Sequence, residues 1–197
     1  SAEMIRDQSL AVSGLLSVKL GGPPVKPYEV TESFKPMGRD KGEGLYRRSL
    51  YTFWKRTGPA PVMMALDASK RDVCRVKRER TSTPLQALVM LNDPQIIEAS
   101  RTLGEKFHKK YKGNIHLILN EMFTLSTGRE PSEKESELLQ GMYIEQKLEF
   151  LKDPDASKKF LSIGDATYDQ NLPKEEIASL GVLANAIFNL WESIAKF

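Results

Sequence analysis

The sequence has one cysteine, Cys74, and two histidines, His108 and His116, among 197 residues. A single cysteine excludes an internal disulfide framework, and so few cysteines and histidines exclude a Cys-rich or multi-histidine metal centre. No C-x-x-C-H sequence occurs, so this chain carries no covalently attached c-type haem. No apolar run approaches 18 residues, which excludes a predicted transmembrane helix. We therefore expect no cofactor in this chain.

The first residues, Ser1 to Arg6, include neither an initiator methionine nor a charged segment followed by an apolar one, as a signal peptide would have. We interpret the chain as a piece excised from a longer polypeptide. On this interpretation, the N-terminus of the chain does not report its localisation.

Bulk composition describes an ordinary globular protein. Hydrophobic residues make up 40% and charged residues 28% of the sequence, so disorder is not expected. A chain of this length can bury one substantial core, or two small ones. The net charge of +3 is too small to indicate a nucleic-acid partner by itself.

Apolar residues recur with helical spacing over most of the chain, and the pattern predicts an all-α fold with about six helices. The predicted ranges are 2–18, 85–91, 94–111, 115–126, 132–152 and 173–194. Ser132 and Glu135 form the capping-box pattern, whereas residues 153–172 are polar, poorly periodic and predicted to be a loop. We expect one domain over 1–197, with an irregular segment, 20–83, over the surface of a helical bundle, 84–197. Residues 49–54 are the one candidate strand.

The most unusual stretch interleaves basic and aromatic residues. Between Leu45 and Arg80 the sequence has ten lysines or arginines against three acids. Guanidinium groups bind carboxylate, sulfate or phosphate, and aromatic rings offer stacking faces, so this stretch is a candidate site for an anion or a glycan. The candidate ligand-binding residues are Arg47, Arg48, Tyr51, Trp54, Arg56, Asp67 and Arg80. The alternative is a scaffold, in which the aromatics are core and the basic groups pair with acids.

The basic run 70–80 contains no aromatic residue and includes Asp72 and Glu79. This pattern argues against nucleic-acid binding and favours a solvated face or a contact between domains. Cys74 lies within the run. Cationic neighbours would lower the pKa of its thiol if it were exposed, but we expect a buried, inert cysteine.

Two blocks, RRSLYTFWKR and RTSTPLQALVMLND, closely resemble the signature of the planctomycete-type domain of unknown function 1553 family. GGPPVKPYE and GREPSEKE are also similar to segments of that family. The resemblance implies the C-terminal domain of a large exported protein, periplasmic or at the cell surface. It also implies a companion domain, a cytochrome-c-like domain with haem c elsewhere in the parent, and a context of polysaccharide processing. It supplies no catalytic residues.

These observations lead to two functional hypotheses. The first is a non-catalytic interaction module whose basic and aromatic segment docks against companion domains or against an anionic or sulfated glycan. The alternative is part of a composite active site, redox or carbohydrate-active, which domains outside this chain would complete. Arg47, Arg48, Tyr51, Trp54, Asp67 and Arg80 would then line a shared cleft.

Overall fold

The computed structural model describes residues 1–31, 35–55, 57–71, 73–74 and 76–195. The chain divides into two compact units. Unit 1 comprises Ser1–Ala11 and Leu15–Val89, and unit 2 comprises Val12–Gly14 and Met90–Phe197. The described residues form helices and loops, and the predicted all-α fold class is confirmed. In the part of the chain that the structure describes, no helix is long and apolar enough to cross a membrane.

Unit 1 is mostly irregular. Its helical elements are α1 (Ala2–Ser13), η1 (Gly42–Leu45), η2 (Ser49–Tyr51), α2 (Pro61–Ala65) and the first part of α3 (Pro84–Asn92). The prediction that the first helix continues to residue 18 was wrong. Gly14 has a left-handed φ of 88°, and the amides of Leu15 and Leu16 both donate to the Leu10 carbonyl, so the helix ends at Ser13.

Among the described residues of unit 1, isolated backbone bridges and no sheet hold the irregular segment together. They pair Ser17 with Arg47, Val25 with Thr52, and Val30 with Met37. The predicted strand over 49–54 was wrong, because Ser49–Tyr51 forms a 3₁₀ turn and only Thr52 makes a bridge. The amides of Val25 and Phe53 complete that bridge by donating to the carbonyls of Tyr51 and Val25.

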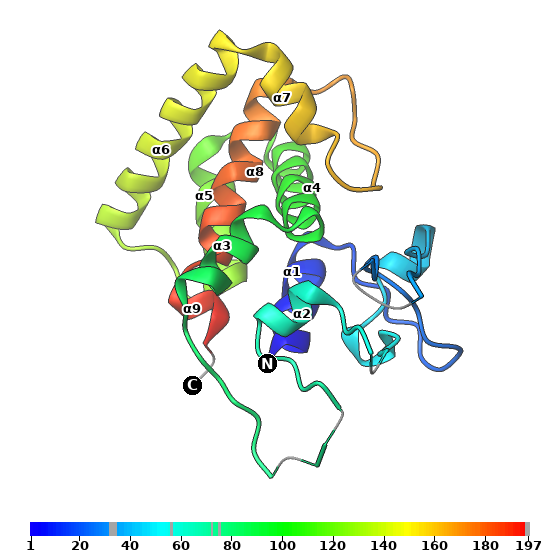
Figure 1. Cartoon of the computed structure of the whole chain (residues 1–197). Helices are drawn as coiled ribbons and strands as arrows, with labels where there is room; N and C mark the ends of the chain where they lie inside the picture. Colours follow the sequence, from blue (N-terminus) through cyan, green and yellow to red (C-terminus); the bar gives the residue numbers. More distant parts are fainter. Residues whose placement is uncertain (32–34, 56, 72, 75, 196–197) are drawn as a thin grey trace. The chain divides into compact units, whose positions relative to one another are not determined.

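Unit 2 is a helical bundle built around α8 (Figure 1). Its helices are α4 (Pro94–Tyr111), α5 (Ile115–Thr127), α6 (Glu133–Lys152), α7 (Pro154–Leu161), α8 (Lys174–Phe188) and α9 (Trp191–Ile194). α8 contacts all the others. The fully buried side chains of this bundle include Leu103, Phe107, Met122, Phe123, Leu180 and Ile187.

The helix boundaries in unit 2 follow local capping residues. Ser132 and Glu135 form the predicted capping box, and α4 ends at Tyr111 as predicted. Two predictions were wrong. Residues 153–172 contain α7, whose first amides bond to the Asp153 side chain, and the last predicted helix is broken between Phe188 and Trp191 into α8 and α9.

Candidate functional site

Arg47 is 5% exposed and organises the backbone of unit 1. Its guanidinium donates to the carbonyls of Pro23 and Lys19, at 3.2 Å each, and to the carbonyl of Gly21. The charge is therefore held by carbonyl dipoles of one loop, which the fork geometry of arginine allows. Both hypotheses from the sequence placed this charge elsewhere, either facing a ligand or paired with an acid.

Arg6 of α1, which sequence analysis did not single out, is 1% exposed and binds the same region from the other side. It donates to the carbonyls of Arg47, at 2.9 Å, and Leu45, at 2.6 Å. The neighbouring Asp7 carboxylate accepts hydrogen bonds from the amide and hydroxyl of Ser49, both at 2.7 Å. The segment 45–49 is thus fastened to α1 by charge-assisted hydrogen bonds.

The two aromatic candidates, Tyr51 and Trp54, are half-buried and already stacked. The Arg47 guanidinium lies 4.0 Å from the centroid of the Tyr51 ring, and the Tyr51 hydroxyl accepts from the Gly21 amide. The Trp54 ring has the Arg71 guanidinium 5.1 Å from its centroid. Its Nε1 donates to the Lys70 carbonyl at 2.8 Å. Both rings therefore contribute one stacking face to the chain's own arginines.

Asp67 closes the base of a long loop between α2 and α3. Its carboxylate accepts from the amide of Thr81 at 2.6 Å, from the Thr81 hydroxyl at 2.7 Å, and from Gln86 Nε2 at 3.0 Å. Burial raises the pKa of the Asp67 carboxyl, but the hydrogen bonds from Thr81 and Gln86 outweigh burial and lower the pKa below its usual value. Asp67 is therefore ionised and holds Thr81 and Gln86 by hydrogen bonds.

The cationic loop, residues 70–80, lies between α2 and α3 (Figure 1). Trp54 fixes its first residue and Asp67 fixes Thr81, the residue after its end. Its described residues are all exposed, including Val73, at 63%, and Val76, at 109%. Arg78 forms an ion pair with both oxygens of Glu3, at 3.0 and 3.1 Å. Unit 1 thus presents an exposed basic loop that includes two exposed valines.

The seven candidate residues are not gathered in one cleft among the residues described. Arg47 packs on Tyr51, whereas Trp54 and Asp67 hold the two ends of the cationic loop. Arg48 and Arg80 are exposed, and Arg56 lies outside the described residues. Cys74 was expected to be buried, and that prediction was wrong: the free cysteine is exposed, because the loop around it contributes no core residue.

A family model described as PSD1, protein of unknown function (DUF1553), matches residues 1–143. The chain belongs to the DUF1553 family. Comparisons with curated proteins and with solved structures gave no significant match. In this DUF1553 chain the matched region includes all of unit 1's described loops, together with α4, α5 and about half of α6.

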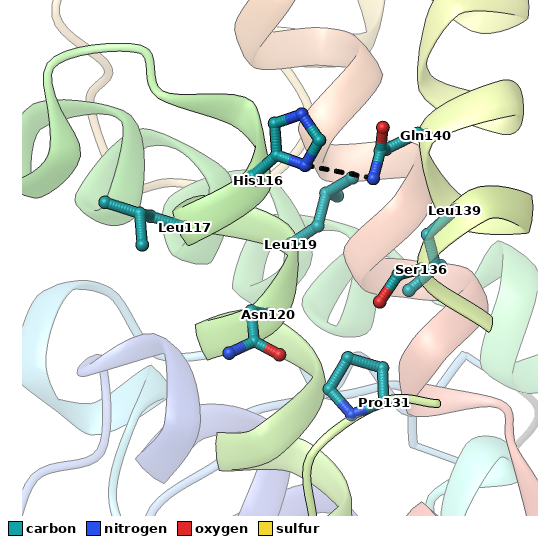
Figure 2. Close-up of a pocket in the computed structure, with 8 residues that line it drawn as sticks. All are labelled: His116, Leu117, Leu119, Asn120, Pro131, Ser136, Leu139 and Gln140. Atoms are coloured by element: carbon teal, nitrogen blue, oxygen red, sulfur yellow. Dashed lines mark hydrogen bonds between the residues drawn. The ribbon is translucent and has the colours of Figure 1, made fainter. Parts of the chain in front are cut away.

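A second feature of the DUF1553 chain, which sequence analysis missed, is a pocket of about 260 Å³ between α5 and α6 (Figure 2). His116 and Asn120 on α5, and Ser136 and Gln140 on α6, are spaced four residues apart, which was the available sequence signal. This spacing identifies a pocket only once the two helices are known to face one another. No cluster of three or more metal-ligating side chains occurs among the described residues.

Proposed function

We propose that this chain is a non-catalytic interaction module whose cationic loop docks onto an acidic protein surface, such as a companion domain of the same parent protein. The observation that carries the proposal is that every described residue of the loop is exposed, while hydrogen bonds from Trp54 and to Asp67 fix its two ends. In the sequence, the loop has six basic and two acidic residues. Complementary charge would set the encounter and the orientation of the partner.

The choice of a protein over a glycan rests on what the loop exposes. Glycan sites use aromatic stacking faces, but the loop contains no aromatic residue, and Tyr51 and Trp54 outside it each hold an arginine of this chain on one face. Val73 and Val76 instead offer small apolar contacts amid the charges. Apolar groups of a partner protein would bury them, gaining roughly 25 cal/mol per Å² of apolar surface removed from water.

The wider setting implied by the family resemblance is part of the same proposal. It comprises an exported parent protein, companion domains, one of them with haem c, and a role near polysaccharide processing. An interaction module would hold such domains in a fixed arrangement. This role requires no nucleophile, general base or metal from the present chain.

The test is retention of the chain on three immobilised polyanions: polyglutamate, a glutamate–tyrosine copolymer and dextran sulfate. We expect salt-sensitive retention, strongest on the copolymer because it adds apolar groups to acidic ones. Lys70→Glu with Lys77→Glu should weaken binding at least about tenfold. Val76→Ser should remove the preference for the copolymer over polyglutamate.

The matched control is Lys41→Glu with Lys134→Glu, which changes net charge equally at exposed lysines outside the cationic loop. It should retain most of the binding. Stronger retention on dextran sulfate than on the glutamate–tyrosine copolymer would assign the loop to glycans instead. An absence of salt-sensitive retention on all three polymers would overturn the docking role.

A further inference from the structure

The pocket between α5 and α6 lies apart in sequence from the cationic loop and is built by a helical hairpin of unit 2 (Figure 2). α5 ends at Thr127 with Gly128 in a left-handed conformation, and the capping box at Ser132 starts α6. This short connection makes the two helices neighbours. The pocket is lined by His116, Leu117, Leu119 and Asn120 from α5, and by Pro131, Ser136, Leu139 and Gln140.

The polar side chains of the pocket carry no permanent charge. His116 Nδ1 lies 3.1 Å from the amide nitrogen of Gln140, and Figure 2 shows this bond at one end of the pocket. With the amide nitrogen as donor, Nδ1 accepts and the neutral imidazole carries its proton on Nε2. The Asn120 amide and the Ser136 hydroxyl lie on opposite helices at the other end of the pocket.

The apolar side chains determine which part of a ligand lies deepest. Leu119 and Leu139 are 3% and 7% exposed, so they form an apolar floor, and Pro131 lines one end. A volume of about 260 Å³ equals roughly nine water molecules at about 30 Å³ each. It is slightly below the 300 Å³ at which drug-sized sites begin. The ligand is therefore a small group with one aliphatic side.

We propose that this pocket binds an uncharged ligand in which a secondary amide adjoins a small aliphatic group, as in an acetamido group. Side-chain amides donate and accept at once, so Asn120 and Gln140 match both the carbonyl and the N–H of such a ligand. The leucine floor takes its methyl group. An ionised ligand would lose hydration without gaining an ionic partner, because none of the lining residues is acidic or basic apart from His116.

This chemistry has two sources, an N-acetylated sugar and an acetylated amino-acid amide, and one titration compares them: the compound that binds more tightly identifies the source. The ¹⁵N-labelled chain is titrated with N-acetylglucosamine, N-acetylalanine methylamide, glucose and acetate, and amide shifts are followed by NMR. We expect saturable shifts confined to residues 116–120 and 131–140 with the two amides, at affinities of about 1 mM, as suits so small a ligand. Glucose and acetate should leave these signals unchanged.

Gln140→Leu and Asn120→Leu should each weaken amide binding at least tenfold. Asn120 is exposed, so its replacement keeps the experiment informative if Gln140→Leu perturbs the fold. Gln146→Leu, on the same helix but outside the pocket, is the matched control and should bind normally. Equal responses to glucose, unchanged binding by both pocket variants, or no shifts at 50-fold above the expected dissociation constant (about 50 mM) would overturn the proposal.

Discussion

Arg6 and Arg47 hold guanidinium charges that are almost fully removed from solvent, at 1% and 5% exposure. Each donates to at least two backbone carbonyls, which are strong acceptors for a charged donor. A lysine in either place could keep the charge but could not span carbonyls lying in different directions. The arginines therefore determine the path of the loops 19–23 and 45–49.

The first prediction concerns Arg47 as a structural residue. Arg47→Met removes hydrogen bonds to three carbonyls and should lower the free energy of unfolding by about 2–4 kcal/mol. Arg47→Lys should have an intermediate effect, because one ammonium replaces the planar fork. Urea unfolding followed by Trp54 fluorescence, in chains whose second tryptophan is removed by Trp191→Phe, reports on unit 1, which contains both Arg47 and Trp54.

Arg48→Met is the matched control, since Arg48 is the adjacent, exposed arginine. Its effect should lie within about 0.5 kcal/mol of zero. The contrary result is an Arg47→Met chain that is as stable as the control and loses retention on the polyanions described above. That result would make Arg47 a binding residue and would contradict its structural role.

At the scale of helices, α4 and α8 approach closely at two glycines. A Cβ at Gly104 would lie 2.8 Å from Leu180 Cβ of α8, and one at Gly181 would lie 3.1 Å from Arg101 Cα of α4. Both distances are shorter than ordinary Cβ contacts, so the two backbones can be this close only because the glycines lack side chains. This contact places α8 at the centre of unit 2.

The second prediction compares two glycines inside helices. Gly104→Ala should destabilise the chain by roughly 1–2 kcal/mol, because overpacking against Leu180 outweighs the better helix propensity of alanine. Gly141→Ala in α6 has nothing within 4 Å and should stabilise it by about 0.5–1 kcal/mol. Thermal unfolding followed by circular dichroism measures both. A Gly104→Ala chain at least as stable as wild type would show that the α4–α8 contact has room for a methyl group.

Helix positions were predictable where the sequence has both apolar periodicity and a cap, as with Ser132 before α6 and Asp93 before α4. α7 was not predicted because it is short and mostly polar, although Asp153 followed by Pro154 is a helix-start pattern. The site was harder. Composition identified Arg47 and Trp54 as unusual, but their partners are the backbone carbonyls of Gly21 and Lys70. Every residue has a backbone carbonyl, so a sequence does not show which one a side chain will bind.

Across the whole molecule, several carboxyl groups in both units have pKa values below their usual range. They are Glu3, Glu43 and Asp67 in unit 1 and Glu135, Asp155, Asp169 and Glu176 in unit 2. In each case the unfolded chain binds protons more readily than the folded chain. Their contribution to stability is therefore complete above the unfolded pKa and is lost as the pH falls through the folded pKa.

Tyr143 limits the stability of the fold at high pH. Burial, followed by the nearby charge of Glu176, raises the pKa of its hydroxyl to about 12 from 10.0. The unfolded chain then loses this proton first as the pH rises, so stability falls between about pH 10 and pH 12. Together, the acidic groups and Tyr143 predict a plateau of stability between about pH 5 and pH 10.

The third prediction isolates the largest of the carboxyl shifts. Hydrogen bonds from Arg129, and then from the Ser132 amide and hydroxyl, lower the pKa of Glu135 to about 2 from 4.5. The same Arg129 also binds Glu192 of α9 at 2.8 Å, so protonation of Glu135 loosens a contact that joins α6 to α9. Between pH 4.5 and pH 2 the wild-type chain should lose this stabilisation progressively.

Glu135→Gln keeps an oxygen for the capping box but has no carboxyl to protonate. Its melting temperature should be lower than wild type at pH 7, and the difference should shrink steadily as the pH falls toward 2. Glu133→Gln, two residues earlier on the same helix, removes the same charge without the Arg129 contact and should keep the wild-type pH dependence. Parallel profiles for Glu135→Gln and wild type would mean that other carboxyls cause the acid sensitivity. In that case Glu176, held at 2.8 Å by Lys147 and at 3.1 Å by His108, is the next group to replace.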